Sequence, residues 1–92
     1  MIRSFKCKKT QALFAGETAP IFRSIRASAE RKLLMLDVAV RLHDLRSPPG
    51  NRLEALRGIR SGQHSIRIND QFRVCFVWSD DGPEDVEIVD YH

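Results

Sequence analysis

The strongest structural signal in the chain lies in residues 65–78, which read Ser65-Ile66-Arg67-Ile68-Asn69-Asp70-Gln71-Phe72-Arg73-Val74-Cys75-Phe76-Val77-Trp78. Apolar and polar side chains alternate on both sides of the turn-forming residues 69–71, and a period of two is typical of half-buried β-strands. We therefore expect strands over 65–68 and 72–78, joined as a hairpin. A further strand is expected at 86–90, after the turn residues Asp81-Gly82-Pro83.

The same alternation predicts which side chains face the core of the protein. The residues expected to point at the helices are Ile66, Ile68, Phe72, Val74, Phe76, Trp78, Val86 and Ile88. The residues expected on the opposite face are Arg67, Arg73, Cys75, Val89 and Tyr91. An antiparallel sheet with helices on one side leaves its other face free for a ligand.

The residues before the hairpin predict one short strand and two helices. A first strand is expected at 2–5, a short helix at 10–14, and a main helix from Pro20 to Leu45, beginning at Thr18-Ala19-Pro20. One face of the main helix is marked by apolar spacings of three and four: Phe22, Ile25, Ala29, Leu33, Leu36, Val40 and His43. The prolines of 47–51 cannot continue a helix. The sequence thus predicts an α+β fold, with helices on one face of a small, mainly antiparallel sheet.

Length and composition limit the classes of protein. Ninety-two residues fit one domain, 1–92. No apolar run is long enough for a membrane span, and Met1-Ile2-Arg3-Ser4-Phe5-Lys6 becomes basic before a signal sequence can develop. Cys7 and Cys75 lack the spacing of a metal site, so we expect reduced thiols in a cytoplasmic protein, with a disulfide as the minor alternative.

The distribution of charge favours a polyanionic ligand. The net charge is +3, and residues 51–73 contain five arginines against Glu54 and Asp70. Residues 74–92 contain six acidic side chains and neither Lys nor Arg. The guanidinium fork matches phosphate geometry, so RNA binding is a reasonable hypothesis, alongside an ordinary solvated surface. The candidate RNA-binding residues are Arg52, Arg57, Arg67 and Arg73.

The C-terminal residues Asp90-Tyr91-His92 are candidates for acid–base catalysis. RNA cleavage without a metal needs a proton acceptor, a proton donor and cations that stabilise the extra charge on phosphorus. Histidine titrates nearest neutrality, so His92 is the candidate for proton transfer, with Arg57 and Arg73 holding the phosphate. A frayed, inactive terminus is the alternative. Of the other histidines, His43 is expected to be structural and His64 to lie at the surface.

The order of these motifs resembles that of the HigB-like toxins of the RelE/ParE superfamily, in their GraT-like branch. The resemblance covers essentially the whole chain. It rests on Met1-Ile2-Arg3-Ser4-Phe5, Ser47-Pro48-Pro49-Gly50-Asn51-Arg52, Leu53-Glu54-Ala55-Leu56-Arg57-Gly58, His64-Ser65-Ile66-Arg67-Ile68-Asn69, Phe72-Arg73-Val74-Cys75-Phe76 and Val86-Glu87-Ile88-Val89-Asp90-Tyr91-His92.

The resemblance implies a RelE-like fold and the toxin of a type II toxin–antitoxin system, acting as a ribosome-dependent messenger-RNA endonuclease. It implies as partners a helix-turn-helix antitoxin, the 70S ribosome and messenger RNA, with operator DNA bound only through the antitoxin. No cofactor, metal or membrane is expected.

The family's site maps onto Arg57, Arg73, Asp90, Tyr91 and His92. Glu54 stands where some relatives have a second histidine. Either Glu54 shares the proton transfer, or His92 works with a phenol and water.

Two alternative functions remain at this stage. A ParE-like toxin would act on DNA gyrase, but those relatives do not need the terminal Asp-Tyr-His group. A non-catalytic module would bind RNA or the ribosome through the basic face alone. Substitution of His92 separates these hypotheses, because only the nuclease depends on it.

Overall fold

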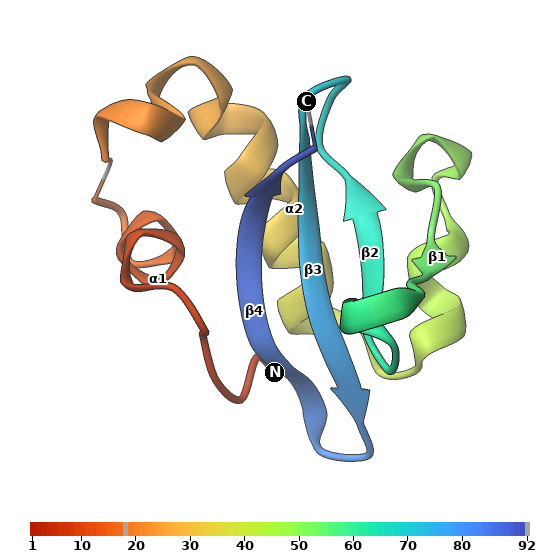
Figure 1. Ribbon diagram of the computed structural model, residues 1–92. Coiled ribbons are helices and arrows are strands. Elements are labelled where there is room, and N and C mark those ends of the chain that lie inside the picture. The colour runs from red at the N-terminus through yellow and green to blue at the C-terminus, as the bar shows by residue number, and fades with distance from the viewer. Residues whose placement is uncertain (18, 92) are drawn as a thin grey trace.

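The computed structural model describes residues 1–17 and 19–91, so Thr18 and His92 lie outside the described residues. The described residues form an α+β fold, as expected. The antiparallel sheet has the order β1-β2-β3-β4, and its strands are β1 (Glu54–Ala55), β2 (His64–Arg67), β3 (Phe72–Ser79) and β4 (Gly82–Asp90). Two α-helices precede it, α1 (Lys8–Phe14) and α2 (Arg26–Val38). In Figure 1, α2 lies behind the sheet and α1 lies beyond β4.

The hairpin predicted at 65–78 is present. Ser65 pairs with Cys75, and Arg67 pairs with Arg73. The connecting turn is held by Asn69, whose Oδ1 accepts hydrogen bonds from the backbone N–H groups of Gln71 (2.9 Å) and Phe72 (2.8 Å). This local bond explains why Asn suits the position.

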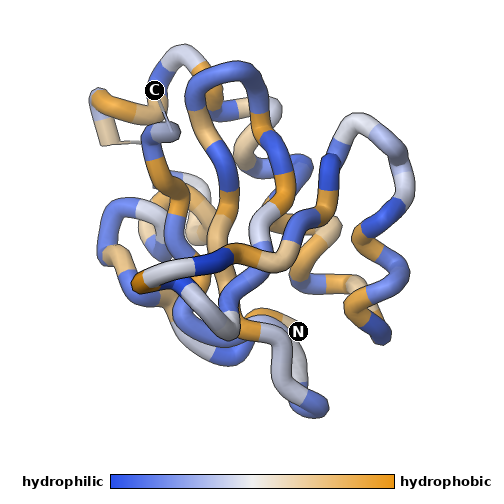
Figure 2. Tube along the Cα trace, turned by 45° about the vertical axis from the view of Figure 1, so that its right-hand side comes forward, coloured by the Kyte–Doolittle hydropathy of each residue, from blue (hydrophilic) through white to orange (hydrophobic). Residues whose placement is uncertain are grey.

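The predicted core face is confirmed. The alternation of apolar and polar residues along the strands is visible in Figure 2. The predicted core residues that are buried are Ile66, Ile68, Phe72, Val74, Phe76, Val86 and Ile88. Trp78 is partly buried and packs against this core. From the helical side, α2 contributes Ala29, Leu33 and Leu36, and the preceding 3-10 helix η1 (Pro20–Ile25) contributes Phe22 and Ile25.

The N-terminal segment covers the outer edge of β4, although the strand expected at 2–5 is reduced to one parallel bridge between Phe5 and Val86. The N–H of Lys6 donates to the Val86 carbonyl (3.0 Å), and the N–H of Val86 donates to the Ser4 carbonyl (3.1 Å). The next N–H group, that of Ile88, donates to the Thr10 hydroxyl (3.0 Å) on α1. An uncovered edge strand would offer these groups to another chain, so this cover prevents strand addition at β4.

The main helix is shorter than the sequence predicted. Its α-helical part ends at Val38 instead of Leu45, and the 3-10 helix η2 (Leu42–Arg46) follows. The reason is local, because Asp44 Oδ2 accepts hydrogen bonds from the N–H groups of Val40 (3.1 Å) and Arg41 (3.0 Å). These bonds cap a new helical turn and also lower the pKa of Asp44. Val40 and His43, expected on the buried face, are consequently exposed.

Asn51 holds the loop between α2 and the sheet. Its side chain is fully buried, and its Nδ2 donates to the carbonyls of Leu45 (3.1 Å) and Ser47 (3.3 Å). Its Oδ1 accepts a hydrogen bond from Lys32 of α2. The loop includes two short 3-10 turns, η2 and η3 (Pro49–Asn51). The Asn51 amide therefore satisfies two carbonyls of this loop and ties it to α2 shortly before β1 begins.

We predict that Asn51→Ala lowers the free energy of unfolding by about 1–3 kcal/mol, because buried carbonyls of the loop lose their donor. Chemical denaturation followed by circular dichroism measures the change. Gln11→Ala, at an exposed position of α1, is the matched control and should differ little from the unsubstituted chain. Equal stability of the two variants would contradict a structural role for Asn51.

Candidate active site on the outer face of the sheet

The sheet face turned away from α2, here called the outer face, brings together residues from all four strands. Register places Glu54 opposite Ser65, Ser65 opposite Cys75, and Cys75 opposite Glu87. These side chains form a row across the sheet, because directly paired residues point to the same face. Arg73 and Tyr91 lie on the same face, toward the C-terminal end of β4.

Arg73 connects several parts of this face. Its Nε donates to Ser65 Oγ (2.8 Å), its Nη2 donates to the carbonyl of Arg52 (2.8 Å), and its Nη1 lies 3.2 Å from Glu54 Oε1. Only 12% of the Arg73 side chain is exposed. Arg52 adopts a left-handed backbone conformation (φ 46°) that presents its carbonyl to Arg73. The guanidinium thus locks β1 and the preceding loop onto β2 and β3.

Tyr91 packs over Arg73 and Cys75. The Arg73 guanidinium carbon lies 5.8 Å from the centre of the Tyr91 ring, within the range of a cation–π contact. The Tyr91 hydroxyl lies 4.0 Å from Cys75 Sγ. Burial and the neighbouring Cys75 thiol raise the pKa of Tyr91, and burial raises the pKa of Cys75. Both groups are therefore protonated at neutral pH, and the phenol is a hydrogen-bond donor.

The outer face is less open than the sequence suggested. Between β1 and β2 the chain forms the 3-10 helix η4 (Gly58–Arg60), which lies in front of the sheet in Figure 1. Arg60 Nη1 reaches across to Glu87 Oε1 on β4 (2.9 Å) and also donates to Gln63 Oε1 (3.1 Å). Cys75, expected on a free face, is completely buried. Sequence reasoning missed this cover because the two residues of the ion pair are far apart in the chain.

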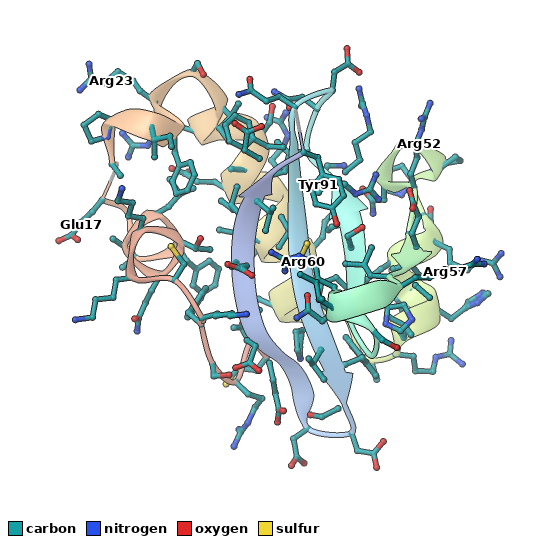
Figure 3. All side chains as sticks on the ribbon, in the orientation of Figure 1. Glu17, Arg23, Arg52, Arg57, Arg60 and Tyr91 are labelled. Atoms are coloured by element: carbon teal, nitrogen blue, oxygen red, sulfur yellow. The ribbon has the colours of Figure 1, made fainter. Side chains whose placement is uncertain are left out.

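The other predicted arginines differ in how far they are restrained. Arg57 is exposed at the start of η4, and Figure 3 shows its side chain extending away from the sheet. Arg52 is also exposed and extends outward in the same view. Arg67 pairs with Asp70 at the hairpin turn. Arg52 and Arg57 are thus the more accessible predicted cations.

The C-terminal group is only partly brought together in the described residues. Asp90 pairs with Phe72, a core residue, so it lies on the opposite face from Tyr91. Its Oδ2 accepts a hydrogen bond from Gln71 Nε2 (3.1 Å). The backbone N–H of Tyr91 donates to the Gln71 carbonyl (2.7 Å), which ties this end of β4 to the hairpin turn. The predicted role of His92 falls on a residue outside the described ranges.

The two remaining histidines lie beside a separate hollow of about 360 Å³ on the helical side of the sheet. His43 and Arg46 come from η2, and His64 comes from β2, where its ring stacks on Phe76. His43, expected to be structural, is exposed, whereas His64 is half-buried, with an Nδ1 that has no partner within the described residues. Neither histidine belongs to the outer-face group.

Comparison with known proteins assigns the family. Residues 3–92 match the family model described as "RelE-like toxin of type II toxin-antitoxin system HigB". The chain belongs to the HigB-like toxin family. It is 51% identical over 57 residues to Toxin HigB-1 of Vibrio cholerae, a match that covers 62% of this chain and 60% of that protein. It is 44% identical over 46 residues to an uncharacterized protein of Haemophilus influenzae, covering 50% of this chain and 46% of that protein.

The matched segments therefore span about half of the curated relatives' length, 60% and 46%. The family assignment itself agrees with the resemblance seen in the sequence. Among residues 1–17 and 19–91, no helix is both long and apolar enough to cross a membrane.

The Tyr91–Cys75 contact can be tested by titration, since Tyr91 is the single tyrosine of the chain. We predict that its phenol ionises above its ordinary pKa of about 10, so that at pH 10 most of it remains protonated. Cys75→Ala should lower the pKa of Tyr91 toward the ordinary value, because the thiol raises it. Phenolate absorbance against pH measures the shift, with circular dichroism confirming that the chain stays folded. Cys7→Ala is the control, and an equal pKa in both variants would contradict the contact.

Proposed function

We propose that this chain is the toxin of a type II toxin–antitoxin system and cleaves messenger RNA on the ribosome, with residues 1–92 as a single toxin domain. Family membership supports the toxin role. The observation that supports cleavage is the convergence of Arg73, Tyr91 and Glu54 on one sheet face, with the exposed Arg57 on the segment that follows β1. A carboxylate, a protonated phenol and cations are the groups that metal-free phosphodiester cleavage uses.

Each side chain has a proposed part in the reaction. The 2′-hydroxyl of RNA attacks the adjacent phosphorus, its proton passes to a base, and the departing 5′-oxygen receives a proton. His92 is proposed for proton transfer, because imidazole titrates nearest neutrality. Tyr91 donates a hydrogen bond from its neutral phenol toward the reacting phosphate.

The charged side chains have supporting parts. Arg57 binds the phosphate, and Arg52 and Arg67 bind neighbouring phosphates. Arg73 stabilises charge and orients Tyr91 and Glu54, which it contacts directly. Asp90 acts indirectly, since it contacts Gln71 on the other face.

The proposed partners follow from the same function. A cognate antitoxin with a helix-turn-helix domain would neutralise the toxin and connect it to operator DNA. The 70S ribosome would present the messenger RNA to the outer face. The proposed site of action is the cytoplasm, and the proposed chemistry needs no metal or cofactor.

Primer extension on a reporter messenger RNA, translated in a purified system with and without ribosomes, tests the proposal. We expect cuts in phase with codons that require ribosomes, and a loss of at least about a hundredfold in His92→Gln, since general acid–base groups contribute about 10²–10⁴-fold. Arg23→Gln, at an exposed position of η1, is the charge control and should cut normally. Growth arrest without any cut would overturn the nuclease and favour action on gyrase or simple ribosome binding.

Glu54 is tested through the pH dependence of the rate. If Glu54 shares the proton transfer, Glu54→Gln should remove one limb of the pH–rate profile, because an amide does not titrate. If Glu54 only anchors Arg73, the profile should keep its shape while the rate falls by about tenfold or less. Tyr91→Phe is a useful comparison, because it removes a donor without changing the charge of the face. An unchanged rate in Glu54→Gln would exclude both roles.

A further inference from the structure

The guanidinium of Arg73 is largely engaged by the protein itself. Each of its nitrogens has a partner, namely Ser65 Oγ, the Arg52 carbonyl and Glu54 Oε1. A guanidinium binds phosphate by directing a pair of N–H groups at its oxygens. Any pair of N–H groups on Arg73 would therefore share its nitrogens with existing protein contacts, and only 12% of the side chain is exposed. The cation that contacts an anion on the outer face should therefore lie elsewhere.

Arg60 has the properties that Arg73 lacks. Its Nη1 holds Glu87 and Gln63, while its Nε and Nη2 have no hydrogen-bond partner within residues 1–17 and 19–91. Its side chain is 29% exposed, more than twice the value for Arg73. Arg60 is thus anchored on one side and retains N–H donors for a ligand.

Arg60 also belongs to the same cluster as Tyr91. Glu87, which holds it, lies directly opposite Cys75 on the neighbouring strand, and Cys75 contacts the Tyr91 hydroxyl. The positive charge of Arg60 acts to lower the pKa of both Cys75 and Tyr91, as expected for a cation close to both groups. Figure 3 shows Arg60 in front of the sheet, with Tyr91 nearer the C-terminal end of β4.

We propose that Arg60, oriented by Glu87 and Gln63, contacts a phosphodiester of single-stranded RNA on the outer face beside Tyr91. This inference rests on the proposed function, because it names the group that binds the substrate of that site. An arginine already held in place loses less side-chain entropy on binding than a freely rotating one. Arg60 would set the position of one phosphate, and the exposed Arg57 would follow the neighbouring backbone.

The test is binding of a fluorescent oligoribonucleotide whose 2′-oxygens are methylated, so that it cannot be cut. We expect Arg60→Gln to weaken binding about tenfold and to reduce the dependence of log K on log salt by about 0.7, the slope for one phosphate contact on a single strand. Arg60→Lys should recover part of the affinity. The matched control is Arg23→Gln, which removes the same charge from an exposed site that Figure 3 shows far from Arg60.

The variant Glu87→Gln separates the effect of Arg60 orientation on RNA binding from the effect of net charge. It raises the net charge from +3 to +4, which by general electrostatics would tighten RNA binding. If Glu87 positions Arg60, binding instead weakens. The variant also gives a measurement if Arg60→Gln fails to fold, with circular dichroism as the check. Tighter binding in Glu87→Gln, or equal losses in Arg60→Gln and Arg23→Gln, would overturn the proposal.

The inference and the proposed function can fail separately. Binding that depends on Arg60, in a chain that cuts no messenger RNA on ribosomes, would leave the phosphate contact in place and refute the nuclease. Codon-phased cutting by a chain whose RNA binding is unchanged in Arg60→Gln would support the nuclease and refute the phosphate contact of Arg60. A wild-type chain that does not bind the methylated oligoribonucleotide would overturn the assignment of Arg60.

Discussion

The centre of β3 is buried on both of its faces, and much of the outer-face structure depends on this constraint. Val74, Cys75 and Phe76 are consecutive, and all are fully buried. Val74 and Phe76 face the helical core, as their apolar character predicts. Cys75 faces the other way, where the Tyr91 hydroxyl contacts it and η4 lies in front of the sheet in Figure 1. The outer face of the sheet, which would otherwise be exposed to solvent, thus contains a second, smaller buried region.

This second region accounts for the chemistry of the outer face. Polar groups that leave water must find partners, since an unpaired buried donor or charge costs free energy. Arg60 pairs with Glu87, and Arg73 pairs with Ser65 and Glu54. The same loss of water raises the pKa of Tyr91 and Cys75. Orientation of the cations and protonation of the phenol therefore have a common physical cause.

The rest of the molecule keeps this region in place. The segment 3–6 and Thr10 occupy the outer edge of β4, so the strand that carries Glu87 and leads into Tyr91 has hydrogen-bond partners on both sides. At the other end of the sheet, Asn51 fixes the loop that leads to Arg52 and Glu54. Both supports bring distant parts of the chain to the borders of one face. That arrangement suits a site which must hold several charges in fixed positions.

Local sequence determined the hairpin at 65–78, the core face of each strand and the α+β class, because alternation and turn chemistry act over a few residues. The order of the motifs in the sequence also pointed to the HigB-like family. The alternation of side chains along the strands placed Arg73 and Tyr91 on the same face of the sheet. The end of the main helix is also set locally, since Asp44 caps a new turn there, but the apolar spacing of three and four continues past that point and did not reveal it. Tertiary structure decided which arginine keeps nitrogens without a partner among the described residues, because the partners of Arg60 and Arg73 include residues far away in the chain. Periodicity carries no information about such long-range pairs, and only the folded chain assigns them.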